Sequence, residues 1–132
     1  MSGGEPARPR GIVIVDHGSR RAESNALLLV VVEEFTRRSG APIVEPAHME
    51  LAEPSIATAV DRCVARGARH VVVNPFFLLP GRHWDTDIPQ LTAAAAARHP
   101  GLTFRVTAPL GPHPLLLEIM RQRIDDAERE LP

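Results

Sequence analysis

Three side chains that can bind a metal ion or accept protons stand close behind short apolar runs of this chain: His17, Glu50 and His83. Neutral imidazole and carboxylate groups are both suitable ligands for Fe, Co, Ni and Zn ions. The same groups serve as general bases, since unperturbed His titrates at about pH 6.5 and unperturbed Glu at about pH 4.3. The residue types alone leave the roles of metal ligand and general base open.

The longest unusual stretch, residues 74–89, surrounds His83 with large apolar side chains. Together with nearby residues it offers an apolar floor for a ligand: Phe76, Phe77, Leu79, Trp84, Met49 and Leu51. The guanidinium groups of Arg20, Arg21 and Arg82 can bind carboxylates through paired hydrogen bonds. These features favour a flat, polycarboxylated ligand that accepts a metal.

Composition excludes several other classes of protein. The formal net charge of −1 gives no bulk attraction to nucleic acid or to an anionic membrane. The single Cys63 excludes an internal disulfide and a CxxC pair, and it falls at a core position of a predicted helix. Without HExxH or CxxC spacing, a transiently held metal fits the chain better than a structural one. No charged-then-apolar leader opens the chain and no apolar run approaches about 18 residues, so we expect neither a visible export signal nor a membrane span.

The elements that must position these side chains alternate between strand and helix. We expect a flexible tail over residues 1–10 and one domain over 11–132. Apolar, β-branched runs predict strands at 11–15, 43–51, 69–74 and 102–108, and helical periodicity predicts helices at 23–38, 53–67, 88–99 and 115–131. Pro54 is expected in the first turn of the second helix, and Asp85 or Asp87 is expected to cap the third.

This alternation predicts an α/β fold: a three-layer, doubly wound, parallel four-stranded sheet of the flavodoxin-like kind. Strand order 2-1-3-4 would put Pro46 on an edge strand, where its missing N–H is tolerated. Ligands of such sheets bind beyond the carboxyl ends of the strands, so His17, Glu50 and the 74–89 stretch would converge there. The first helix carries six consecutive apolar residues, 27–32, so its surplus apolar side is expected to face another subunit.

Three segments in order carry a family resemblance: VDHGSR at 15–20, MELAEPSI at 49–56 and FLLPGRHWDTDIP at 77–89. Over residues 11–124 the chain resembles the class II sirohydrochlorin chelatases, and it looks most like the short sirohydrochlorin ferrochelatases of siroheme biosynthesis, including the plastid type.

The resemblance implies an enzyme, a metal chelatase (lyase) that inserts Fe²⁺ into sirohydrochlorin with release of two protons. His17 and His83 would bind the metal and assist proton removal, and Glu50 would contact the metal or accept a proton. The resemblance also implies a set of substrate-binding residues: Ser19, Arg20, Met49, Phe76, Phe77, Leu79, Arg82 and Trp84. The alternatives are a cobaltochelatase with Co²⁺, and a carrier of metal or tetrapyrrole without turnover; Ni²⁺ is a further candidate metal.

The resemblance further implies a homodimer, while the net charge near zero predicts no nucleic-acid or membrane partner. Plastid members carry additional cysteines after this domain for an iron–sulfur cluster, but with only Cys63 we expect none from these residues. The location would be cytoplasmic in a bacterium and the plastid stroma in a plant or alga. A histidine-phosphatase reading is disfavoured because that chemistry needs Arg before His-Gly, where this chain has Asp16.

Overall fold

The structure, a computed structural model, describes residues 9–81 and 83–130, without the side chains of His83 and Trp84. Its elements, in chain order, are β1 (Arg10–Asp16), α1 (Ala22–Ser39), β2 (Val44–His48), α2 (Ile56–Ala65), β3 (His70–Pro75), the π-helical turn η1 (His83–Asp87), α3 (Ile88–Ala97), β4 (Thr103–Val106) and α4 (Pro114–Arg129). The predicted tail lies mainly outside the described residues and stays a prediction, as does the single domain; Arg10 already belongs to β1.

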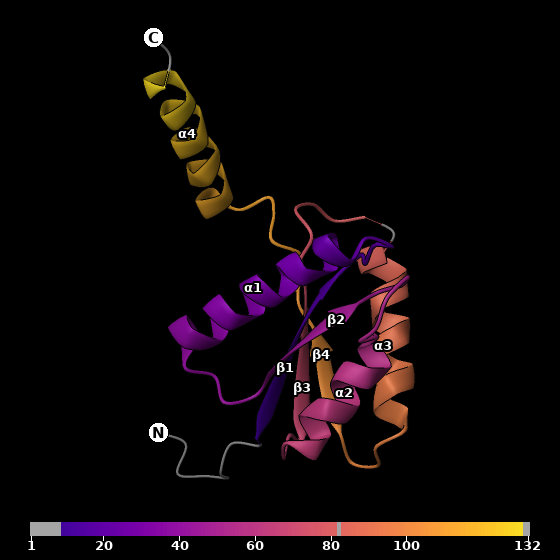
Figure 1. Cartoon of the computed structure of the whole chain (residues 1–132). Coiled ribbons are helices and arrows are strands. Elements are labelled where there is room, and N and C mark those ends of the chain that lie inside the picture. The colour runs from indigo at the N-terminus through magenta and orange to yellow at the C-terminus, as the bar shows by residue number, and fades with distance from the viewer. Residues whose placement is uncertain (1–8, 82, 131–132) are drawn as a thin grey trace.

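The four strands form one parallel sheet in the order β2-β1-β3-β4, which confirms the predicted fold and strand order (Figure 1). Ile12 of β1 aligns with Val44 of β2 on one side and with Val72 of β3 on the other. The strand that contains Pro46 is at an edge, as its proline requires.

One face of the sheet is covered by α2 and α3. The main core lies there, where Val13 of β1 and Val71 of β3 pack with Val60 of α2 and Ile88 of α3. Cys63 is fully buried in this layer, which confirms its predicted core position. Gly11 lets α2 approach closely, because a Cβ on Gly11 would lie 2.9 Å from the Cys63 sulfur.

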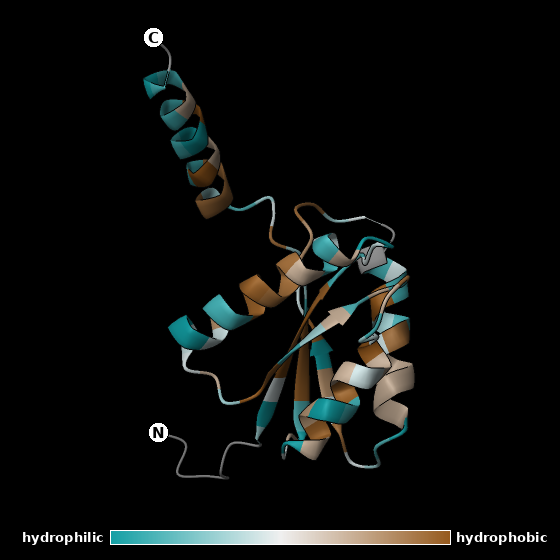
Figure 2. Cartoon of the chain, viewed as in Figure 1, coloured by the Kyte–Doolittle hydropathy of each residue, from teal (hydrophilic) through white to brown (hydrophobic). Residues whose placement is uncertain are grey.

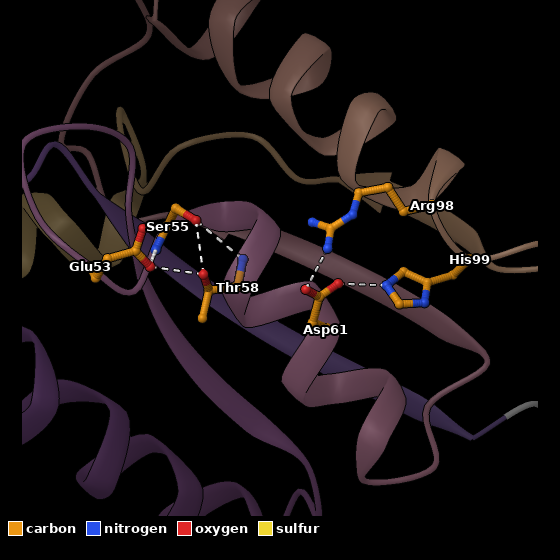
Figure 3. A network of polar contacts seen from close by, with 6 residues as sticks. All are labelled: Glu53, Ser55, Thr58, Asp61, Arg98 and His99. Atoms are coloured by element: carbon orange, nitrogen blue, oxygen red, sulfur yellow. Dashed lines mark hydrogen bonds and ion pairs between the residues drawn. The ribbon is translucent and has the colours of Figure 1, made fainter.

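Polar contacts also join the elements of this layer (Figure 3). Asp61 of α2 accepts a hydrogen bond from Arg98 at 2.9 Å and pairs with Nε2 of His99 at 2.6 Å, both residues lying just after α3. The hydrogen bond with His99, then the charge of Arg98, hold the pKa of Asp61 below its ordinary value. These contacts tie the end of α3 to the middle of α2.

The opposite face carries a thinner layer. Leu28 and Val32 of α1 pack on Ile12, Ile14 and Val44. The predicted surplus apolar surface of α1 is present, since Leu27 is 66% exposed. None of the described residues of α4 is buried, and this helix projects away from the sheet (Figure 1) with apolar residues in its first turns (Figure 2).

Several predicted boundaries are wrong. The second strand ends at His48 rather than at residue 51, because the chain bends there and Leu51 adopts a positive φ of 71°. The second helix begins at Ile56, after a Ser55 cap whose hydroxyl accepts from Thr58 N–H at 3.2 Å, so Pro54 precedes the helix. Asp87 stands at the N-cap of α3 but makes no capping hydrogen bond. Within the described residues, no helix is both long and apolar enough to cross a membrane.

Candidate functional site

The carboxyl ends of β1 and β2 are joined beyond their last strand residues. Met49 N–H donates to the Asp16 carbonyl at 2.8 Å, and Glu50 N–H donates to the His17 carbonyl at 3.1 Å. His17 and Glu50, predicted from distant parts of the sequence to share one rim, are therefore hydrogen-bonded neighbours through their backbones. Their side chains are both exposed, at the edge where ligands of parallel sheets bind.

His17 also contacts the segment after β3. Its imidazole stacks on the ring of Phe77, with ring centroids 4.4 Å apart and planes inclined by 24°. Phe77 is half-buried against the main core, and the backbone before it is held by the bond from Phe76 N–H to the Val15 carbonyl at 2.7 Å. The core thus supports one face of the His17 ring.

Gly18 allows this close meeting of β1 and β2. Its φ of +90° lies in the left-handed region, which side chains rarely adopt. A Cβ at this position would stand only 1.9 Å from the Glu50 carbonyl oxygen. Any other residue would therefore push apart the backbones that carry His17 and Glu50.

The segment between β1 and α1 is tightly turned. Ser19 N–H donates to Asn25 Oδ1 at 2.9 Å, and Asn25 Nδ2 returns a bond to the Ser19 carbonyl at 2.8 Å. The Ser19 hydroxyl accepts from Arg21 N–H at 3.0 Å, while Arg20 is exposed. Ser19, predicted to bind substrate, has a turn-forming role here, and Asn25 is a positioning residue that the sequence did not single out.

A hollow of about 370 Å³ lies beside Glu50. It is lined by Met49, Glu50, Asp87, Gln90 and Leu91. Glu50 and Met49 were predicted site residues, whereas Asp87 was expected only to cap a helix, and Gln90 and Leu91 were not singled out. The missed signal is spacing: Asp87, Gln90 and Leu91 share one side of the helical segment that follows His83.

His83 belongs to η1, whose last residue, Asp87, lines the Glu50 hollow. The bond from Asp85 N–H to the Gly81 carbonyl at 3.0 Å closes the start of this segment. Arg82 and the side chains of His83 and Trp84 fall outside the described part of the structure, so their predicted roles stay predictions. The backbone path nevertheless leads directly from the His83 position to the hollow.

The apolar residues after β3 form the outer part of the same rim. Phe76 and Leu79 are exposed, as a ligand floor requires, and Phe77 and Met49 are half-buried behind them. The segment before α4 contacts this loop, because Leu110 N–H donates to the Phe77 carbonyl at 2.8 Å.

A pair formed by a buried histidine and a half-buried aspartate supports the rim from below. His48 is only 4% exposed, and its Nδ1 lies 2.6 Å from Oδ1 of Asp16. Asp16 directly precedes His17, and His48 precedes Glu50 by two residues. This geometry gives His48 a supporting role beneath the rim.

The remaining histidines have structural partners. His70 pairs with the Thr103 hydroxyl at 2.7 Å, and His113 caps α4 by accepting from Leu115 N–H at 3.0 Å. Among the described side chains, no three His, Cys, Asp or Glu gather into a group that could hold a metal ion. The described part of the rim thus offers an apolar floor with an imidazole and carboxylates around it, rather than a closed structural metal site.

Comparison with known proteins adds independent findings. The family model CbiX matches residues 11–127. The chain is 62% identical over 114 residues to the sirohydrochlorin ferrochelatase, chloroplastic, of Arabidopsis thaliana, covering 86% of this chain and 51% of that protein. It is 31% identical over 122 residues to the sirohydrochlorin cobaltochelatase of Priestia megaterium, covering 92% of this chain and 40% of that one.

Solved structures give the same picture. SirB from Bacillus subtilis with Fe³⁺ matches with a TM-score of 0.84 and 29% identity, over 93% of this chain and 48% of that chain. A putative cobalamin biosynthesis CbiX protein from Marinobacter aquaeolei matches with a TM-score of 0.74 and 31% identity, over 93% of this chain and 100% of that chain. The chain therefore spans about half the length of the first curated relatives and the whole length of a shorter structural one.

Proposed function

The chain belongs to the CbiX family, and from that premise we propose that it inserts Fe²⁺ into sirohydrochlorin, giving siroheme and two protons. The observation that carries the proposal is the 62% identity with a sirohydrochlorin ferrochelatase across 86% of the chain. The match to a SirB structure with Fe³⁺ supports the same metal.

The rim has the groups that this reaction needs. Metal insertion replaces two pyrrole N–H protons by one divalent ion, so the site must receive protons while the metal loses water. His17 serves as ligand or base: the lone pair of its unprotonated ring nitrogen lies in the ring plane, so the stack on Phe77 does not block its direction. Glu50 and Asp87 place carboxylates around the adjoining hollow, and His83 completes the set from the segment that leads into it.

Substrate binding uses the apolar rim together with cationic side chains. Phe76 and Leu79 present exposed apolar surface, on which a flat tetrapyrrole is stabilised by burial of its ring. Arg20, which is exposed beside His17, and Arg82 bind carboxylates at the ring edge.

The test is an anaerobic absorbance assay of sirohydrochlorin with Fe²⁺ and catalytic amounts of protein. His17→Ala and His83→Ala are each expected to lose about 10²–10⁴-fold in rate, the usual contribution of a positioned base. His70→Ala is the matched control, because His70 lies at the opposite end of the sheet and should keep the parent rate. Circular dichroism would establish that all three variants are folded.

Two results would overturn the proposal. The first is metal insertion at the parent rate in both the His17 and the His83 variants. The second is a spectral change that never exceeds one equivalent of protein, as a carrier would give.

The relatives named as cobaltochelatases support Co²⁺ as the second candidate metal. The same assay with Co²⁺ and Ni²⁺ ranks the metals, and we expect Fe²⁺ to give the highest kcat/KM because the ferrochelatase match is 62% identical, against 31% and 40% for these cobaltochelatases. The chloroplastic name of the Arabidopsis relative supports the plastid location over the cytoplasmic one, which subcellular fractionation would test.

A further inference from the structure

The turn after β2 holds a leucine in an unusual backbone conformation. Leu51 has a φ of 71°, and among the described residues other than glycine it is the only one with a positive φ. The left-handed region brings the Cβ atom close to the following carbonyl oxygen, so a large side chain is uncommon there and Gly or Asn is usual. The local conformation of this turn therefore does not favour leucine.

Packing within the fold does not explain this leucine either. Leu51 is 56% exposed, and it belongs to neither of the two apolar clusters of the described structure. An exposed apolar side chain is common at protein surfaces, but here it is combined with an unfavourable backbone conformation. Gly or Asn would fit the turn with less strain and would expose less apolar surface. A strained residue without a packing role indicates a role in binding.

The surrounding hydrogen bonds keep the turn in this conformation. His48 N–H donates to the Pro54 carbonyl at 2.8 Å, and His48 also bridges Ser55, so the two ends of the turn lie side by side. Between these ends, Glu50 N–H donates to the His17 carbonyl at 3.1 Å. Because the turn is held at its ends and in its middle, it cannot relax to a more common conformation.

The order of the strands places this turn on one side of His17. Since β1 lies between β2 and β3, His17 after β1 has Leu51 after β2 on one side and Phe76 after β3 on the other. Neighbouring strands are about 4.8 Å apart, so the ends of β2 and β3 are roughly 10 Å apart. A macrocycle of four pyrrole rings is wide enough to bridge this span. Exposed apolar residues thus stand on both sides of the imidazole.

We propose that Leu51 contacts the tetrapyrrole on the β2 side of the rim, and that the strained turn holds the leucine side chain in place for this contact. The inference rests on the proposed function, which supplies sirohydrochlorin as the ligand, and it adds a binding residue to that site. Leucine has no group that binds a metal or takes a proton, so its contribution is to ligand affinity. Burial of its exposed surface under the ring provides that affinity.

Two substitutions separate the strain from the contact. Leu51→Gly removes both the side chain and the steric strain, whereas Leu51→Ala removes the contact but keeps the Cβ atom that makes a positive φ unfavourable. At most positions Ala is the more stabilising of the two, because Gly loses more conformational entropy on folding. Here we expect the reverse order: the midpoint of urea unfolding should be higher for Leu51→Gly than for Leu51→Ala.

Both variants should bind the tetrapyrrole more weakly than the parent. Fluorescence titration with metal-free sirohydrochlorin should give a dissociation constant raised roughly five- to ten-fold, from the loss of about half of a buried leucine side chain. Leu51→Met, which keeps an apolar side chain of similar volume, should bind nearly as the parent does. Phe104→Leu is the matched control, because Phe104 is 37% exposed but lies near the amino end of β4, away from the rim.

Steady-state kinetics provide the second readout. With Fe²⁺ in the absorbance assay, Leu51→Ala should raise the KM for the tetrapyrrole by the same factor and leave kcat at the parent value. The reason is that a contact made equally to the substrate and to the transition state contributes to binding only. His17→Ala should give the opposite result, a loss in kcat.

Three results would overturn the inference. One is an unchanged dissociation constant for metal-free sirohydrochlorin in both Leu51→Gly and Leu51→Ala. Another is a Leu51→Ala protein more stable than Leu51→Gly, because the strain would then be absent. The third is a loss confined to kcat in Leu51→Ala, which would give the turn a role in placing Glu50 instead. Binding is measured without metal, so a protein that binds the tetrapyrrole but inserts no metal would contradict the proposed function and leave this inference standing.

Discussion

The two faces of the sheet are completed to different degrees. On one face, α2 and α3 lie over Val13 and Val71 and bury them fully, and Gly11 brings α2 into close contact with β1. On the other face, α1 covers β1 and β2 only, and a groove over β3 stays open. The closed face can stabilise the fold of a single copy, whereas the open face leaves apolar surface for association.

Ion pairing follows the same division. On the closed face the pairs join different elements, such as Asp61 with Arg98 and Arg66 of the α2 C-cap with Glu45 of β2. On α1 and α4 they stay within one helix, such as Glu34 with Arg37. Pairs between elements fix tertiary structure, and pairs within a helix support only that helix. The ion pairs therefore show the same difference between the two faces of the sheet as the buried apolar residues do.

The largest expected effect on stability comes from a substitution on the closed face, which α2 and α3 cover. Ile88→Ala should lower the free energy of unfolding by about 2–5 kcal/mol, because it leaves a cavity around a fully buried side chain. Leu27→Ala on α1 removes an exposed side chain and should change the free energy of unfolding by less than about 0.5 kcal/mol. Urea unfolding at low protein concentration measures both, and equal losses would contradict the difference between the faces.

A smaller effect on stability is expected from the contacts of Asp61 with Arg98 and His99, which join α2 to the end of α3. Asp61→Asn should cost roughly 0.2–1 kcal/mol at pH 7, the range for exposed ion pairs. Because the folded pKa of Asp61 lies below its ordinary value of 3.8, the carboxylate stabilises the fold above that pH. As the pH falls through the lowered folded pKa, this contribution is lost.

Unfolding measured from pH 7 to pH 2.5 should therefore show parent and Asp61→Asn converging at the acid end. Glu33→Gln, at an exposed position of α1, is the control and should leave the parent curve unchanged over this range. A gap between parent and Asp61→Asn that is constant over the whole range would rule out this role for the carboxylate.

The smallest effect is chemical and leaves stability unchanged. Burial raises the pKa of Cys63 to about 12, so at pH 8 almost no thiolate is present and iodoacetamide should not label the folded protein. A cysteine on the open side, Val30→Cys, should be labelled once per chain under the same conditions, because Val30 is exposed. Mass spectrometry measures the labelling of both proteins. Unfolding in urea should make Cys63 reactive as well. Labelling of Cys63 without denaturant would show that the closed face opens readily.

Most of the fold follows from local pattern. The run 11–15 is apolar on both sides, as a central parallel strand must be, and Pro46 assigned its strand to an edge. Boundaries were less predictable, because Ser55 and Pro54 are both ordinary helix-start residues and only the bond from Thr58 N–H decides between them. The outward direction of α4 was not predictable at all, since it depends on the particular bonds of Leu110 and His113 in the junction before the helix.

The candidate site divides in the same way. Strand-end placement brought His17 and Glu50 together, because the order of the strands determines which ends are neighbours. The stack on Phe77 and the carboxylate of Asp87 in the hollow could not be predicted, since both depend on how the 76–87 segment turns. Asn25 was missed because its two bonds to Ser19 are a feature of one particular turn.

The hydrogen bond from Leu110 to the Phe77 carbonyl joins the root of α4 to the loop on which His17 rests. Where such a shared segment couples two sites, the coupling is reciprocal. If one direction of α4 orders that loop, the ordered loop favours that direction by the same factor. A ligand bound on the loop would then restrain the last helix, and its binding would be readable far from the rim.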